Sequence, residues 1–106
     1  MKQIITRKQL KDAEEILRDS VNLDTEVPLE VRGNYVGRGM RHECVGIVCA
    51  NVGEVIEFMI AVAEVLSPDD LEDQKVIVSE MGYNLLSDGM GKYDMIYYFP
   101  GLTIGD

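Results

Sequence analysis

At the centre of this chain is the apolar segment Val52-Gly-Glu-Val-Ile-Glu-Phe-Met-Ile-Ala-Val-Ala-Glu-Val-Leu66. Asn51 precedes it as a helix N-cap, and Glu54 completes a spacing like that of a capping box, so we expect a helix over roughly 52–66. Its few charged positions form a narrow stripe with one alanine: Glu54, Glu57, Ala61 and Glu64. A helix this apolar is covered on more than one side. We expect either that a sheet and another helix both pack on it, or that a second protomer does.

Another helix is predicted from about residue 7 to residue 19. Thr6 and Gln9 have the spacing of a capping box, in which each side chain bonds to the backbone N–H of the other residue. One face of this helix is apolar, with Leu10, Ala13, Ile16 and Leu17. The other face is charged, so the helix is expected to lie on the surface with one side against the core.

Four segments have the pattern of strands: Leu29–Arg32, Cys44–Cys49, Lys75–Ser79 and Tyr93–Phe99. Cys44–Cys49 is a continuous apolar run, which is typical of a central strand. The acids at 69, 70, 72 and 73 are expected to form a solvated turn after the central helix. The resulting order, α-β-β-α-β-β, predicts a single α+β domain over residues 1–106, with two helices on a small antiparallel sheet of about four strands.

The composition narrows the classes of function. The chain has 106 residues and a formal charge of −9, which argues against binding to duplex nucleic acid. No apolar run reaches the roughly 18 residues of a membrane span, and the first residues lack the apolar core of a signal peptide. Cys44 and Cys49 lie on opposite faces of one strand, so they are expected to be reduced thiols. Together these features favour a cytoplasmic protein.

The basic residues are concentrated in Arg32-Gly-Asn-Tyr-Val-Gly-Arg-Gly-Met-Arg41. This stretch holds three of the ten basic residues, three of the ten glycines and no acid, so the rest of the chain carries a formal −12. Arginine makes bidentate contacts to phosphate, and glycine lets backbone N–H groups approach the same oxygens. The stretch is therefore the strongest candidate for an anion site. The alternative is a solvated turn whose arginines pair with nearby carboxylates.

A second glycine-rich loop, Asn84-Leu-Leu-Ser-Asp-Gly-Met-Gly91, also joins two predicted strands. If both hairpins point the same way, the two loops meet at one edge of the sheet. Together they supply arginines for phosphate, Asp or Ser for ribose hydroxyls and Tyr for stacking on a base. No P-loop and no dinucleotide-binding glycine motif is present. The candidate ligand-binding residues are Arg32, Asn34, Tyr35, Gly37, Arg38, Gly39, Met40, Arg41, Ser87, Asp88, Gly89 and Gly91.

Catalytic groups are weakly indicated. His42 and Cys44 could form a dyad, but a dyad needs a third group to orient it, and the chain has one histidine only. Packing of Cys44 in the core is the simpler interpretation. No nucleophile elbow is found, and no carboxylate pair stands out for acid–base chemistry. The sequence therefore predicts no enzyme, no metal site and no cofactor.

Two stretches resemble small phage-encoded proteins. Arg32-Gly-Asn-Tyr-Val-Gly-Arg-Gly-Met40 resembles an Arg-x-x-Tyr-Ser-Gly-Arg-Gly-Met signature, and Asp88-Gly-Met-Gly91 followed by Ile96-Tyr-Tyr-Phe-Pro100 resembles an Asp-Ser-Met-Gly segment with its following strand. This pattern is similar to that of the first-described phage anti-Thoeris family. The resemblance implies an oligomeric sponge that binds cyclic ADP-ribose-type signals, or cyclic oligonucleotides, without cleaving them. Val36 and Gly89 each stand where the pattern has Ser.

The sequence thus predicts sequestration of a small phosphorylated, cyclic nucleotide by a homo-oligomeric phage counter-defence protein in the host cytoplasm. The pocket would be formed by the two glycine loops, either within one protomer or across an interface. The main alternative is an acidic protein–protein inhibitor that occupies the nucleic-acid-binding groove of a host protein. An enzyme that uses Cys44 and His42 ranks third.

Overall fold

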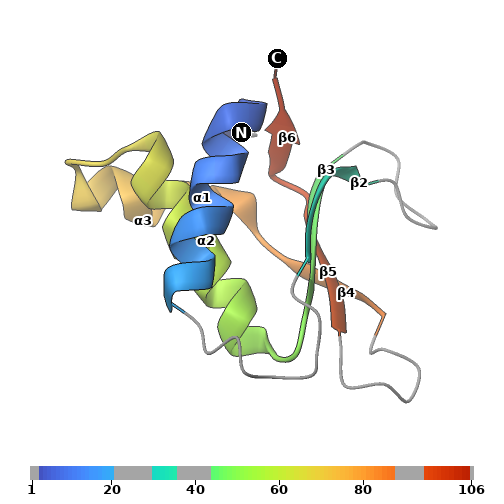
Figure 1. Ribbon diagram of the computed structural model, residues 1–106. Coiled ribbons are helices and arrows are strands. Elements are labelled where there is room, and N and C mark those ends of the chain that lie inside the picture. Colours follow the sequence, from blue (N-terminus) through green and yellow to red (C-terminus); the bar gives the residue numbers. More distant parts are fainter. Residues whose placement is uncertain (1–2, 21–29, 36–43, 88–94, 106) are drawn as a thin grey trace.

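The structure, a computed structural model, describes residues 3–20, 30–35, 44–87 and 95–105. Within these residues the chain forms three helices and two sheets, so the expected α+β class is confirmed (Figure 1). In chain order the elements are β1 (Gln3–Ile5), α1 (Arg7–Ser20), β2 (Glu30–Tyr35), β3 (Cys44–Cys49), α2 (Val52–Leu66), α3 (Leu71–Met81), β4 (Asn84–Ser87), β5 (Met95–Phe99) and β6 (Leu102–Ile104). The predicted order α-β-β-α-β-β is therefore incomplete.

The main sheet is antiparallel and has the strand order β2-β3-β5-β4. β3 lies between β2 and β5, which confirms the prediction that Cys44–Cys49 is a central strand. Its register with β5 runs from Val45 opposite Phe99 to Cys49 opposite Met95. The helices cover one face of this sheet (Figure 1). β2 and β4 are consequently the two edges of the sheet, on opposite sides.

A second, two-stranded sheet joins the two ends of the described chain. β1 pairs with β6 in parallel, from Gln3 beside Leu102 to Ile5 beside Ile104, and the two termini lie close together in Figure 1. Gly101, just before β6, donates its N–H to the carbonyl of Met81 at 2.8 Å, and its own carbonyl accepts from the N–H of Gln3 at 2.6 Å. A Cβ at position 101 would collide with the carbonyl oxygen of Glu80. Only glycine fits this junction without a shift of the backbone.

The first two helices begin where their capping residues predict. The N–H of Gln9 donates to Oγ1 of Thr6 at 3.1 Å and the N–H of Thr6 donates to Oε1 of Gln9 at 2.9 Å, which completes a capping box. At α2, the N–H of Glu54 donates to Oδ1 of Asn51 at 3.1 Å. Glu54 in turn accepts from the N–H of Ala50 at 3.1 Å, one residue before the cap.

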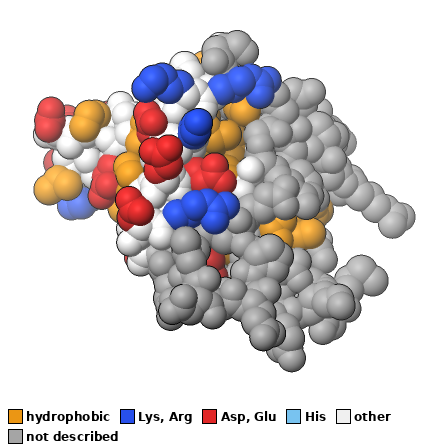
Figure 2. Space-filling model, in the orientation of Figure 1, with side chains coloured by type: hydrophobic (Ala, Val, Ile, Leu, Met, Phe, Trp, Pro, Cys, Tyr) orange, Lys and Arg blue, Asp and Glu red, His pale blue; other side chains and the backbone are white. Residues whose placement is uncertain are grey.

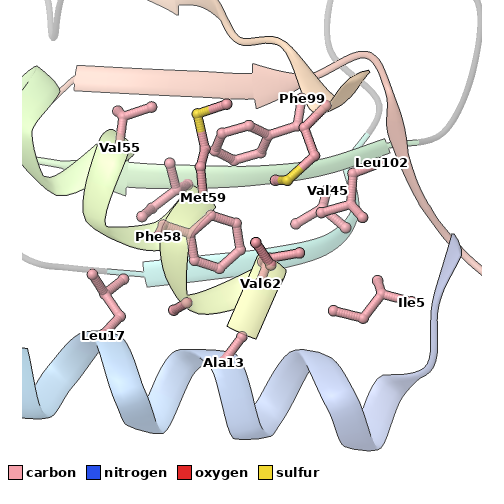
Figure 3. Packing of buried hydrophobic residues seen from close by; sticks show 14 of the residues in the cluster. Ile5, Ala13, Leu17, Val45, Val55, Phe58, Met59, Val62, Phe99 and Leu102 are labelled. Atoms are coloured by element: carbon pink, nitrogen blue, oxygen red, sulfur yellow. The ribbon is translucent and has the colours of Figure 1, made fainter. Parts of the chain in front are cut away.

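The core lies between the helices and the main sheet, with contributions from the small sheet. Figure 3 shows side chains of α1 and α2 pointing toward those of the strands. Phe58 of α2 and Phe99 of β5 are both fully buried, and their ring centroids are 5.1 Å apart. The residues labelled in Figure 3 are Ile5, Ala13, Leu17, Val45, Val55, Phe58, Met59, Val62, Phe99 and Leu102. Residues from six elements, β1, α1, β3, α2, β5 and β6, therefore pack into a single core.

The predicted strand over 75–79 is wrong, because this segment belongs to α3. Asp70 caps the helix by accepting the N–H of Asp73 at 3.0 Å. Gln74 donates to the carbonyl of Ser67 at 2.7 Å, which closes the turn between α2 and α3. Ile77 and Met81, four residues apart, are the buried side chains of the helix. The acids expected in a solvated turn thus cap and begin a helix.

The fourth strand of the main sheet is β4, which lies in the segment expected to be a glycine-rich loop. Asn84 pairs with Tyr98, Leu85 with Tyr97 and Ser87 with Ile96, with a register shift between Leu85 and Ser87. A short edge strand of four residues has little period-two pattern from which it could be predicted.

The apolar α2 is covered by α1, α3 and β3, as the first of the two expectations proposed for it requires. Its exposed stripe differs from the predicted one. Ala61 is 1% exposed and belongs to the core, whereas Ile56 and Ile60 are 38% and 41% exposed. The apolar surface that α2 leaves uncovered therefore lies beside α3 rather than on the sheet side.

Candidate functional sites

The residues predicted to bind a ligand are divided between two separate strands. Arg32, Asn34 and Tyr35 belong to β2, and Ser87 ends β4. The other predicted ligand residues lie outside the described part of the chain: Gly37, Arg38, Gly39, Met40, Arg41, Asp88, Gly89 and Gly91. β2 and β4 are the two edges of the main sheet. The three residues on β2 are therefore separated from Ser87 on β4 by the two central strands, β3 and β5.

The register also separates the two glycine loops along the strands. The first loop leaves β2 after Tyr35, which pairs with Cys44 at the start of β3. The second loop enters β5 at Met95, which pairs with Cys49 at the end of β3. Five residue steps along β3 correspond to about 16 Å. The two hairpins therefore leave opposite ends of the sheet, and the loops that would have to meet, residues 36–43 and 88–94, lie outside the described part of the chain.

Of the two cysteines, only Cys49 has a side chain within the described part of the structure. Cys49 is buried and unbridged, and its Sγ lies 3.4 Å from the carbonyl oxygen of Asn51. His42 and the side chain of Cys44 lie outside what the structure describes. Among the described residues, no three His, Cys, Asp or Glu side chains are grouped as metal ligands. No helix in the described ranges is both long enough and apolar enough to cross a bilayer.

A tyrosine lies in the core near this thiol. Tyr97 is 7% exposed, and its ring is in edge contact with that of Tyr83, with centroids 5.9 Å apart. Burial raises the pKa of Tyr97 above its ordinary value of 10.0, and Cys49 and Tyr83 raise that pKa further. The phenol is therefore neutral at physiological pH and suits packing rather than proton abstraction.

A small hollow lies between α1, β2 and β6. It has a volume of about 210 Å³ and is lined by Arg7, Leu10, Lys11, Glu14, Val31 and Ile104. Glu14 forms an ion pair with Arg18 at 3.2 Å. The lining mixes both signs of charge with apolar groups, which does not single out a class of ligand.

A groove with a volume of about 410 Å³ lies between α2 and α3, and it was not predicted from the sequence. Ile56, Ile60 and Ala63 line it from α2, at positions i, i+4 and i+7. Leu71, Gln74, Lys75 and Val78 line it from α3, again within two turns. The matching periodicities were visible in the sequence, but the groove could not be found while 75–79 was assigned to a strand.

Negative charge is concentrated on the helices that form this groove. Residues 51–81 contain eight carboxylates and a single lysine, a formal −7 out of the −9 of the whole chain. Lys75 is itself paired with Glu72 at 3.4 Å. Figure 2 shows one face of the molecule, on which Asp and Glu side chains lie over the helices together with Lys and Arg side chains. The lining of the groove is therefore mostly apolar, with Lys75 as its one charged side chain, and the segment that forms the groove is acidic.

Comparison with protein-family models, with curated proteins and with solved structures gives no match to this chain.

Proposed function

We propose that this chain is a non-enzymatic binding protein that sequesters a small phosphorylated nucleotide. The observation that carries the proposal is the presence of Arg32, Arg38 and Arg41 within ten residues of an otherwise strongly acidic chain. Guanidinium groups and glycine N–H groups are both suited to phosphate oxygens. The stretch begins in β2, an edge strand of the main sheet.

The strand register favours a pocket shared by two copies of the chain. The β2–β3 and β4–β5 hairpins leave opposite ends of the sheet. We therefore expect a pocket that combines the first loop of one protomer with the second loop of another. Such an interface excludes water and strengthens the contacts between arginine and phosphate. A homo-oligomer with pockets between protomers therefore follows from the proposal.

The resemblance to phage anti-Thoeris sponges supports a cyclic ligand of the cyclic ADP-ribose type and a role in counter-defence. Sequestration requires affinity but neither a nucleophile nor a general base. Val36 and Gly89 lack the hydroxyls of the family pattern, so we expect a ligand preference different from that of proteins that carry both serines.

The test is thermal unfolding in the presence of cyclic ADP-ribose isomers, linear ADP-ribose and cyclic dinucleotides. A ligand at a hundred times its Kd stabilises the native state by about 2.7 kcal/mol, which corresponds to a rise in Tm of about 10 °C or more for a chain of this size. The ligand is then released by heat and identified by mass spectrometry. Recovery of the unchanged ligand supports sequestration, and recovery of a cleaved product contradicts it.

Two variants make the test specific. Arg38→Ala should abolish the stabilisation, whereas Arg18→Ala, which removes an arginine from α1 that pairs with Glu14, should leave it unchanged. The mass of the complex, measured by light scattering, should be a multiple of the chain mass of 11.9 kDa. If none of the phosphorylated ligands stabilises the protein, or if Arg38→Ala behaves like wild type, the proposal fails.

A further inference from the structure

Large exposed apolar residues are concentrated on α2 and α3, the two helices that form the groove. Eight large apolar residues are exposed in the described ranges, and five of them lie on these two helices. Of these five, Ile56, Ile60 and Leu71 line the groove, and Leu71 is 73% exposed. Side chains that reach into solvent this far add little to the core. They are suited to contact with a partner.

The spacing within the groove fits a helix. The lining positions on α2, from Ile56 to Ala63, extend over about 10 Å, or two helical turns. Leu71 and Val78 repeat the same seven-residue interval on α3. A third helix that lies between the two can insert apolar residues at i, i+4 and i+7, which is the usual way in which an amphipathic helix binds in a groove.

The charge around the groove indicates the kind of helix. Glu57 and Glu64 are both exposed and directly follow Ile56 and Ala63, so they lie about 100° around α2 from the groove residues. Glu72 is on the exposed side of α3, where it holds Lys75. Opposite charges at the rim steer association and set the choice of partner. A second copy of this chain would bring the same acidic segment, residues 51–81 with a formal −7, against the first.

We propose that the α2–α3 groove binds a lysine- or arginine-rich amphipathic helix of another protein. The apolar face of that helix rests on Ile56, Ile60 and Leu71, and its basic flanks reach the rim carboxylates Glu57 and Glu64. This activity is separate from nucleotide binding, because it uses none of the arginine–glycine stretch. It narrows the expectation of an acidic protein–protein inhibitor to one surface and one class of partner.

The probe is a fluorescein-labelled peptide of about four helical turns with leucines at i, i+4, i+7 and i+11 and lysines at the flanking positions. Its counterpart has every lysine replaced by glutamate. Fluorescence anisotropy should show binding of the lysine peptide that weakens as salt is raised. The glutamate peptide should bind at least about tenfold more weakly, since its flanks meet like charges.

Single substitutions locate the binding surface. Ile60→Ser and Leu71→Ser each remove an exposed apolar side chain from the groove. Each should weaken the binding of the lysine peptide by at least about tenfold. Val76→Ser is the matched control, because Val76 is 50% exposed on α3 but does not line the groove. Thermal unfolding of all three variants checks that each remains folded.

Four outcomes would overturn the proposal. The first is equal affinity for the lysine and glutamate peptides, and the second is no binding of the lysine peptide at millimolar concentration. The third is a fall in solution mass from an oligomer in wild type to a single chain in Ile60→Ser. That result would mean that the groove forms the contact between copies of this chain. Retained peptide binding by both Ile60→Ser and Leu71→Ser would place the peptide elsewhere and would refute the assignment as well.

Discussion

Replacement of Gly101 by alanine tests the junction that connects both sheets to α3. A Cβ at this position would collide with the carbonyl oxygen of Glu80 and would lie 2.8 Å from that of Met81. These are backbone atoms, which cannot rotate away as a side chain can. The backbone at position 101 must therefore shift, and two hydrogen bonds depend on its present position. They are the 2.8 Å bond from the N–H of Gly101 to Met81 and the 2.6 Å bond from the N–H of Gln3 to Gly101.

The expected loss follows from these two contacts. A backbone hydrogen bond contributes about 1 kcal/mol net, so Gly101→Ala should lower the free energy of unfolding by about 2 kcal/mol or more. For a domain of this size that corresponds to a fall in Tm of about 10 °C. Far-ultraviolet circular dichroism during urea and thermal unfolding measures both quantities.

Gly105→Ala is the matched control near the same small sheet. A Cβ at 105 would also meet a neighbour, but that neighbour is Cγ2 of Ile4, whose side chain is 61% exposed and can turn into solvent. This variant should stay within about 0.5 kcal/mol of wild type. If Gly101→Ala is as stable as Gly105→Ala, the inferred close contact between Gly101 and the end of α3 is refuted.

Three further substitutions test other parts of the fold. Asp70→Ala removes the N-cap of α3 and should cost about 1 kcal/mol in urea unfolding, while Asp69→Ala, with no cap bond in the described structure, should cost little. Phe58→Ala deletes a buried ring that packs 5.1 Å from Phe99 and should cost about 3–5 kcal/mol, and a smaller loss would mean that the α2–β5 contact is loose. Tyr97 has a raised pKa in the folded state, so the native protein holds this proton to higher pH than the unfolded chain, and stability should fall as pH rises above 10.0. Tyr97→Phe should flatten that alkaline decline in unfolding experiments from about pH 9 to pH 11, and an equally steep decline would assign it to other groups.

Elements with local start signals were predictable from sequence. Thr6 with Gln9 and Asn51 with Glu54 specify where α1 and α2 begin, because capping bonds join residues only three apart. The continuous apolar run of β3 was equally clear, since a strand buried on both faces has no polar positions. In these elements the tertiary structure agrees with the local preference.

Residues 75–79 show where a secondary-structure prediction from local residue preferences fails. Val76, Ile77 and Val78 are β-branched and favour a strand, yet they lie in α3. Two facts outweigh that preference, namely the cap at Asp70 and the burial of Ile77 with Met81 at helical spacing. The cap residue was readable from sequence, but the burial depends on the position of α2 and could not be read.

The candidate ligand site was likewise only partly predictable from sequence. Concentration of arginine and glycine over 32–41 is a property of sequence alone and needs no fold. Whether its loop meets the second glycine loop depends on strand order, and β4 was not predicted as a strand. Once β3 and β5 are antiparallel neighbours, the two hairpins must leave opposite ends of the sheet. This strand order depends on contacts between strands distant in sequence, which local patterns do not reveal.

The charges of the chain give its two candidate surfaces opposite preferences. A nucleotide phosphate should be attracted by residues 32–41, with three arginines and no acid, and repelled by residues 51–81, with eight carboxylates and one lysine. A lysine-rich helix has the reverse preference. Arg38→Ala should therefore abolish nucleotide binding and change peptide affinity by less than about twofold, and Ile60→Ser should do the opposite. Loss of both activities in Ile60→Ser, together with a lower solution mass, would show instead that the groove holds the copies together and that the nucleotide pocket depends on that assembly.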